Sequence, residues 1–301
     1  MAASSIDPID LSEARERISA AYDPEILRSA GRDVIELLAD HLTSSEASHG
    51  RVLNWNSPQS NIDEARRFLR GAESASTPKN IARQLRSLAE VMLSRGHNLH
   101  DPRYIGHQVP ASVPLAGLFD AIGSVTNSVM AVYEMGPWAT ACEMALIELL
   151  GERIGYPAGQ FAGLITHGGS LANLTALLTA RNVVLGESWS AGIPAESPRP
   201  VVVSHQAAHY CIERSAGILG IGTEQCIKAP LDDRGRIDPD KLADLLAQLQ
   251  AQGLTVIAVC ASACATPIGD FDSLSRIADV CERFGVWMHV DAAHGGAACL
   301  S

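Results

Sequence analysis

Residues 286–296 read Val-Trp-Met-His-Val-Asp-Ala-Ala-His-Gly-Gly, an apolar run followed by an acidic residue and then a glycine pair. The run over residues 286–290 predicts a buried strand, since apolar, aromatic and β-branched residues suit a pleated surface. Asp291 follows at the carboxyl end of this strand. Burying a carboxylate is costly unless a cationic group meets it, so the stretch predicts a site as well as a strand.

Three earlier runs predict further strands, at residues 162–166, 201–204 and 255–260. Amphipathic helices are expected to begin between the runs, near Ser170, Ala207, Asp238 and Asp272. Gly253 and Gly285 follow helical runs and suit C-terminal caps that return the chain to the sheet. This alternation predicts an α/β domain with a largely parallel sheet, whose ligands bind at the carboxyl ends of the strands.

The first hundred residues predict a helical arm. Asp23-Pro-Glu25 is a helix start, with Asp23 as the cap, and a second start is Thr77-Pro78. Residues 51–60 and 71–76 are rich in Asn, Ser, Pro and Gly and predict loops. Two more helices are expected at 115–131 and 138–154. We therefore divide the chain into an arm, 1–100, and a larger domain, 101–301.

Composition narrows the class of protein. A chain of 301 residues with 47% hydrophobic and 19% charged residues can bury a sizeable core. Its net charge of −11 argues against nucleic-acid and anionic-membrane partners. We expect a cytoplasmic protein without a membrane span, since the first thirty residues lack an apolar core of the signal-peptide kind. Five cysteines in apolar stretches are read as reduced core residues, namely Cys142, Cys211, Cys260, Cys264 and Cys281.

A glycine turn follows the run at residues 162–166. Gly168, Gly169 and Ser170 precede a helical pattern, and such a turn lets backbone N–H groups and a serine hydroxyl approach a phosphate. A tight turn with a serine cap is an equally good interpretation of these residues alone.

Histidines follow the run at residues 201–204. His209 is placed to stack on a planar cofactor, whereas a packed or capping role is expected for His205. A zinc site built from His205, His209, His289 and His294 is disfavoured. Only the first two have helical i, i+4 spacing, and no H-E-x-x-H motif is present.

Five segments in order resemble the group II pyridoxal 5′-phosphate (PLP) dependent decarboxylases, which include glutamate, aromatic amino-acid and diaminobutyrate decarboxylases. The segments are Asp101-Pro-Arg-Tyr-Ile-Gly-His107, Gly136-Pro-Trp-Ala-Thr-Ala-Cys-Glu143, Thr166-His-Gly-Gly-Ser-Leu-Ala-Asn173, Ser204-His-Gln-Ala-Ala-His209 and His289-Val-Asp-Ala-Ala-His-Gly-Gly296. The resemblance spans nearly the whole chain. It implies the PLP-dependent transferase fold type I and a homodimer with sites at the interface.

The resemblance also implies roles for single residues. Gly168, Gly169 and Ser170 would hold the phosphate, while His209 and Ala293 would cover the two ring faces. Asp291 would pair with the ring nitrogen, which makes His209 and Asp291 the expected catalytic residues. Thr266 would lie near the cofactor, although Cys264 and Ala265 depart from the family's usual Gly-Thr-Thr run. Tyr104 and His107 would line the substrate side.

The implied reaction is decarboxylation of an L-amino acid to an amine, with the pyridinium accepting the electrons left at Cα. In the family, the lysine that holds the cofactor lies beyond the aspartate, and none of Lys79, Lys228 and Lys241 has that position. The implied sheet order is 3-2-4-5-6-7-1, so the strand at 162–166 would lack its neighbour. We therefore expect a fragment, a truncated product or a split subunit completed by a second polypeptide. It would lack the C-terminal small domain, be inactive and be poorly stable by itself.

Three alternatives remain open. An aldehyde synthase performing oxidative deamination would share every motif quoted above. An aminotransferase or carbon–sulfur lyase of the same fold would share the phosphate turn and the aspartate, although the segment with Pro137, Thr140 and Glu143 favours a decarboxylase. A chain without the lysine is also compatible with a non-catalytic partner subunit.

Overall fold

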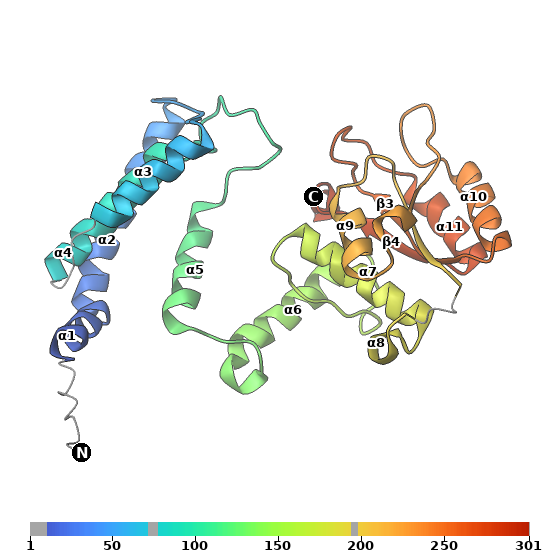
Figure 1. Cartoon of the computed structure of the whole chain (residues 1–301), viewed down its shortest axis with the longest axis horizontal. Coiled ribbons are helices and arrows are strands. Elements are labelled where there is room, and N and C mark those ends of the chain that lie inside the picture. Colours follow the sequence, from blue (N-terminus) through green and yellow to red (C-terminus); the bar gives the residue numbers. More distant parts are fainter. Residues whose placement is uncertain (1–10, 72–77, 194–197, 301) are drawn as a thin grey trace, which may run out of the picture. The chain divides into compact units, whose positions relative to one another are not determined.

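The computed structural model describes residues 11–71, 78–193 and 198–300. The chain divides into two compact units, Met1–Asn127 and Ser128–Ser301. Figure 1 shows that the first unit is helical and that the sheet belongs to the second.

The first unit contains the helices α1 (Ser12–Ala21), α2 (Pro24–Glu46), α3 (Pro58–Gly71), α4 (Pro78–Arg95) and α5 (Pro114–Thr126). The start of α2 is confirmed, because the Asp23 carboxylate accepts a hydrogen bond of 2.9 Å from the Glu25 N–H. A helix from Pro78 is also confirmed, while Thr77 and the predicted loop at 72–76 lie outside the described residues. The predicted loop at 51–60 is wrong at its end, since Pro58 has a φ preset for a helix and begins α3.

The second unit opens with the one-turn helix η1 (Tyr133–Met135) and α6 (Pro137–Arg153). Next come α7 (Gly169–Leu185), α8 (Ser188–Ala191), β1 (Pro200–Ser204), α9 (Cys211–Ile218), η2 (Thr223–Gln225) and β2 (Cys226–Lys228). The remaining elements are α10 (Pro239–Ala251), β3 (Thr255–Ser262), α11 (Leu274–Phe284), β4 (Trp287–Asp291) and η3 (Gly296–Leu300). Gly285 caps α11 in the left-handed conformation, as predicted.

All strand pairs in the sheet are parallel, and the strand order is β2-β1-β3-β4. The α/β class with a parallel sheet is therefore confirmed. If β1 to β4 take the places of family strands 2 to 5, this order is the 3-2-4-5 part of the implied sheet. Parallel strands end on the same edge, so β1, β3 and β4 present their carboxyl ends side by side.

Several predicted bounds are wrong. Residues 162–166 form no strand, because a strand needs a hydrogen-bonding neighbour and the described chain gives them none; the Ile165 N–H instead donates to the Glu143 carboxylate at 2.7 Å. The helix expected to run to residue 131 stops at Thr126, where Asn127 turns left-handed with φ 48°. The helix expected near Ala207 begins only at Cys211, after a turn that contains His209.

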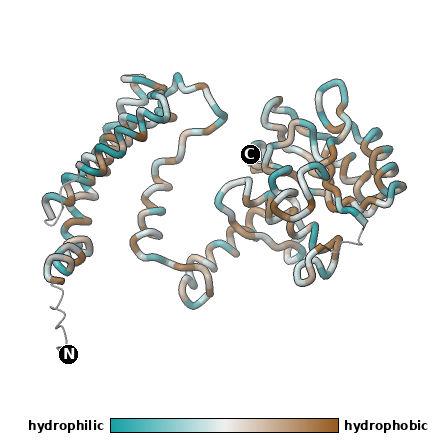
Figure 2. Tube along the Cα trace, viewed as in Figure 1, coloured by the Kyte–Doolittle hydropathy of each residue, from teal (hydrophilic) through white to brown (hydrophobic). Residues whose placement is uncertain are grey.

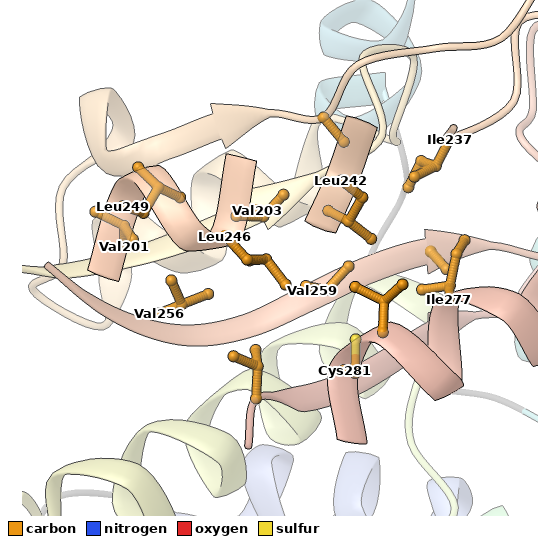
Figure 3. Close-up of a cluster of buried hydrophobic side chains, with 14 residues drawn as sticks. Val201, Val203, Ile237, Leu242, Leu246, Leu249, Val256, Val259, Ile277 and Cys281 are labelled. Atoms are coloured by element: carbon orange, nitrogen blue, oxygen red, sulfur yellow. The ribbon is translucent and has the colours of Figure 1, made fainter. Parts of the chain in front are cut away.

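Two apolar clusters cover the two faces of the sheet. On one face, α10 and α11 pack against β1 and β3. Leu242, Leu246 and Leu249 of α10 form one cluster with Val201, Val203 and Val259 of the strands (Figure 3). On the other face, α7 and α9 cover the sheet through Leu177, Ile212 and the strand residues Val202 and Ile257. The sheet is thus the middle of three layers. Figure 2 shows hydrophobic stretches of the chain running through this part of the second unit.

The seven cysteines are free, and five of them are buried. Cys142 is exposed on α6, so its assignment to the core was wrong. Burial raises the pKa of the Cys281 thiol to about 11, as expected for a packed rather than reactive cysteine. Among the helices that the structure describes, none is long and apolar enough to cross a membrane.

Candidate active site

A cavity of about 230 Å³ lies where β1, β3 and β4 end and α7 begins. Its walls come from the starts of helices and the ends of strands, the usual position of ligands in open parallel sheets. The lining residues are Gly169, Ser170, Asn173, His209, Cys211, Cys264, Thr266, Asp291, Ala293 and His294.

One wall of the cavity is the N-terminus of α7. Gly168 caps this helix with φ 87°, a backbone conformation that glycine adopts without strain. The first N–H groups of a helix have no partner within it and carry a partial positive charge, so this wall favours an anion. A Cβ on Gly169 would lie 2.7 Å from the Ala293 Cβ, so only glycine lets the turn after β4 approach α7 this closely.

Another part of the wall carries the carboxylate of Asp291, the last residue of β4. Its Oδ1 accepts from the Ala293 N–H at 3.1 Å, and its Oδ2 accepts from the Asn173 side-chain amide at 2.9 Å. Asn173 is buried and also binds His289 Nε2 at 2.7 Å. Burial lowers the pKa of His289 below its usual 6.5, although the nearby Asp291 carboxylate acts in the opposite direction. The lowered pKa favours the neutral form of this imidazole.

His209 lies in the turn between β1 and α9 and lines the cavity. Its Nδ1 accepts from the Cys211 N–H at 3.3 Å, so in the neutral ring Nε2 carries the proton. The Tyr210 ring lies 4.1 Å from that of His209, and the Arg214 guanidinium lies 4.5 Å from the Tyr210 ring.

His205 is fully buried, and its ring contacts the Gly235 carbonyl at 2.7 Å and the Ala207 N–H at 2.9 Å. The packed role predicted for His205 is therefore confirmed. No group of three or more potential metal-ligating side chains gathers within the described ranges.

The loop after β3 forms the floor of the site. Its backbone is tied to the turn after β4, since the Ala263 N–H donates to the Asp291 carbonyl at 2.8 Å and the Gly295 N–H donates to the Ala263 carbonyl at 3.0 Å. These bonds bring Cys264 and Thr266 beside Asp291 on the cavity wall.

Most of the residues predicted to contact the cofactor meet at this cavity: Gly169, Ser170, His209, Thr266, Asp291 and Ala293. Gly168 instead lines an adjoining hollow of about 470 Å³ between the glycine turn and β4. Tyr104 and His107 belong to the first unit, in the segment between α4 and α5, and their substrate role stays a prediction.

Neither lysine whose side chain is described lines the cavity. Lys228 pairs with Glu213, and Lys241 pairs with Asp238.

Four lining residues were not predicted: Asn173, Cys211, Cys264 and His294. A sequence signal existed for Asn173, because it lies four residues after Gly169 and therefore on the same face of α7. Cys211 follows His209 by two residues, but nothing local indicated that its side chain would turn toward the site.

The family model described as pyridoxal-dependent decarboxylase conserved domain matches residues 73–301, most of the chain. The chain belongs to this family. It is 30% identical over 233 residues to L-2,4-diaminobutyrate decarboxylase of Acinetobacter baumannii, covering 73% of this chain and 46% of that protein. It is 28% identical to human cysteine sulfinic acid decarboxylase, covering 94% of this chain and 56% of the relative. The chain thus spans about half the length of these curated relatives.

Solved structures agree on the fold. The crystal structure of mouse CSAD in apo form matches with a TM-score of 0.80 at 28% identity, covering 93% of this chain and 57% of that one. Rice TDC with PLP and tryptamine matches with a TM-score of 0.79, and its 24% identity is evidence of the fold alone.

The residues present fit a pyridoxal phosphate. A glycine turn at a helix N-terminus suits the phosphate, a carboxylate on the same cavity wall suits a protonated ring nitrogen, and His209 adds a planar ring to the lining. Bound there, the cofactor would supply an electron sink for a carbanion at the substrate Cα.

Proposed function

We propose that the protein carrying this chain is a PLP-dependent carboxy-lyase that converts an L-amino acid to the corresponding amine and CO₂. The observation that carries the proposal is the position of Asp291, which lines the same cavity as the N-terminus of α7. One wall suits a phosphate and the other suits a pyridinium, which matches the two ends of a single PLP molecule.

In this proposal each cofactor-binding residue has a separate role. Gly168, Gly169 and Ser170 bind the phosphate, which anchors the ring. Asp291 keeps the ring nitrogen protonated, and His209 and Ala293 hold the two ring faces. The family match and the decarboxylase relatives support this assignment over the aminotransferase and lyase alternatives. A 4-hydroxyphenylacetaldehyde synthase of Rhodiola rosea shares the fold at 21% identity, which is no support for oxidative deamination here.

We further propose that residues 1–100 form an arm used in a homodimer and that residues 101–301 belong to the cofactor domain. Support comes from α2 and α4, whose large apolar side chains include several that are 39–65% exposed, namely Leu27, Ile35, Leu38, Leu85, Leu88 and Met92. Burying them against a second copy would remove this surface from water. A cytoplasmic location fits the free cysteines.

Cofactor binding tests the site. The purified chain should bind PLP more tightly than unphosphorylated pyridoxal by about tenfold or more, because the phosphate adds charge-assisted hydrogen bonds. Inorganic phosphate should compete with PLP for the site.

The protonation state of the cofactor ring is a second test, read from the ¹⁵N NMR shift of bound, ring-labelled PLP. Asp291→Ala should move this signal toward the unprotonated position, whereas Asp279→Ala, on the exposed side of α11, should leave it unchanged. Equal binding of PLP and pyridoxal would reject the site.

Decarboxylation itself is tested on the protein expressed from its native coding region. Carboxyl-labelled L-amino acids should release labelled CO₂ in a PLP-dependent manner. Asp291→Ala should abolish turnover while reducing PLP binding less, because the phosphate turn remains. Release of an aldehyde and ammonia in place of the amine would instead favour the aldehyde synthase.

A further inference from the structure

The side-chain amide of Asn173 joins the two walls of the cavity. Its Nδ2 donates to Asp291 Oδ2 at 2.9 Å and to Cys211 Sγ at 3.2 Å, and its Oδ1 contacts His289 Nε2 at 2.7 Å. Asn173 lies one turn into α7, whereas Asp291 and His289 lie on β4. A single buried amide therefore ties the start of the glycine-turn helix to the strand that carries the carboxylate.

The direction of this amide follows from its partners. An ionised carboxylate only accepts hydrogen bonds, so the NH₂ group of Asn173 must face Asp291 and the oxygen must face His289. His289 Nε2 is then the donor, which fixes the Nε2–H tautomer of its neutral ring. The chain of hydrogen bonds runs in one direction, from His289 through Asn173 to Asp291.

The same contacts restrict the carboxylate. Asp291 Oδ1 is held by the Ala293 N–H and Oδ2 by Asn173, so rotation of the carboxylate would break one of two bonds. A carboxylate accepts about four hydrogen bonds in all, so both oxygens keep capacity for a partner in the cavity. Ala293 supplies a backbone donor that a side-chain change leaves in place, whereas Asn173 supplies a side-chain donor.

We infer that Asn173 is a positioning residue that directs the Asp291 carboxylate toward the cofactor ring nitrogen, with His289 locking the direction of the Asn173 amide. The inference rests on the proposed function and adds a residue pair to it. Asn173 touches no reacting atom in this assignment, and its effect passes through Asp291.

A first test needs no cofactor. Long-range ¹H–¹⁵N NMR of the chain should show the His289 ring neutral with its proton on Nε2, the resonance being assigned by its loss in His289→Gln. Asn173→Asp is isosteric but replaces both donors with a second carboxylate, so it should increase the protonated fraction of His289. The matched control is Asn182→Asp, the same change on the same helix, where the side chain accepts from Arg181 and Ser188. A proton on His289 Nδ1 in the wild-type chain would reverse the amide and overturn the inference.

The second test measures the ring nitrogen of bound, ¹⁵N-labelled PLP. Asn173→Asp and Asn173→Ala should each move the signal from the wild-type position by at least about half of the shift caused by Asp291→Ala, since the carboxylate loses a charge-assisted partner. Asn182→Asp should leave it in place. If the ring-nitrogen signal stays at its wild-type position in both Asn173 variants, the inference is overturned and the proposed function still stands. Failure of the wild-type chain to bind PLP would reject both.

A third variant separates folding from positioning. Exchanging the pair, Asn173→Asp with Asp291→Asn, restores one donor and one acceptor across the same gap. The exchanged chain should recover the wild-type unfolding midpoint while its PLP nitrogen stays unprotonated. Recovery of a protonated nitrogen would contradict the inference, because the carboxylate would then act equally well from α7.

Discussion

Replacing Gly169 with alanine should destabilise the chain and weaken its cofactor site through one contact. The added Cβ would lie 2.7 Å from the Ala293 Cβ, whereas carbon atoms pack at about 3.5–4.0 Å. Either the first turn of α7 or the turn after β4 must therefore move by roughly 1 Å. Overpacking of this kind costs about 1–3 kcal/mol. The better helix propensity of alanine offsets at most about 1 kcal/mol of it.

The displacement matters for function because both segments line the cavity. A shift of about 1 Å at a catalytic site can reduce the rate roughly a hundredfold. We therefore expect Gly169→Ala to lower PLP affinity as well as the free energy of unfolding in urea.

A double variant isolates the contact. Ala293→Gly removes the opposing methyl group, so it should restore much of the stability of Gly169→Ala, with a coupling energy of about 1 kcal/mol or more. Gly168→Ala is the control. A Cβ there meets nothing within 4 Å, but φ 87° strains any L side chain. Its destabilisation should not be relieved by Ala293→Gly. If Ala293→Gly fails to rescue Gly169→Ala, the contact is not the cause.

Other predictions concern the scaffold. Leu246→Ala, at a fully buried position between α10 and the sheet, should cost about 2–5 kcal/mol in urea unfolding, and Leu245→Ala, at a partly buried one, should cost less. Asp272→Asn should lower the thermal midpoint, because the buried carboxylate accepts from the Ile237 and Ser262 N–H groups at 2.8 and 2.7 Å and an amide oxygen cannot serve both equally. The pKa of His289 is lowered in the folded chain. As the pH falls, this histidine therefore takes up a proton near pH 6.5 in the unfolded chain and only at lower pH in the folded chain. Unfolding free energy should therefore fall as pH drops below about 6.5, and His289→Gln should flatten this dependence between about pH 7.5 and 5.5.

Local signals predicted three of the four strands of the sheet and several helix caps, but they missed β2. The Asp238 carboxylate accepts from the Asp240 and Lys241 N–H groups at the start of α10, as an Asp-Pro sequence indicates. The strand at β4 and the left-handed glycine at 285 depend on residues within a few positions of one another, so the sequence contains the information directly.

The strand predicted at 162–166 shows the limit of prediction from local sequence. Its apolar residues have the composition of a strand, but a parallel strand forms only when a neighbour satisfies its backbone groups. In the described chain, Thr166 and Val290 line the same hollow, and no strand lies between them. Local composition cannot report whether such a neighbour is present.

The residues of the candidate site also fall into two groups, those that local motifs indicate and those that depend on long-range packing. Glycines and strand ends indicated Gly169, His209 and Asp291, because each belongs to a motif whose backbone role is local. Asn173 donates to a residue 118 positions away, and Cys211 accepts from one 38 positions away. Such contacts arise only when α7, α9 and β4 pack together. The spacing from Gly169 indicates the helix face on which Asn173 lies, but no local pattern predicts its partner or that of Cys211.

Packing also explains why the segment after Asp291 contains glycine at position 295. A Cβ on Gly295 would lie 2.7 Å from both the Ala263 carbonyl oxygen and the Cys264 nitrogen, atoms of a backbone that cannot turn aside as a side chain can. Glycine there lets the turn after β4 rest on the loop after β3, while Gly169 lets it rest on α7. The turn that follows Asp291 is thus packed against the loop after β3 at Gly295 and against α7 at Gly169. Gly295 and Ala293 therefore help to position the aspartate, through the close packing of this turn and through the Ala293 N–H that donates to Asp291 Oδ1.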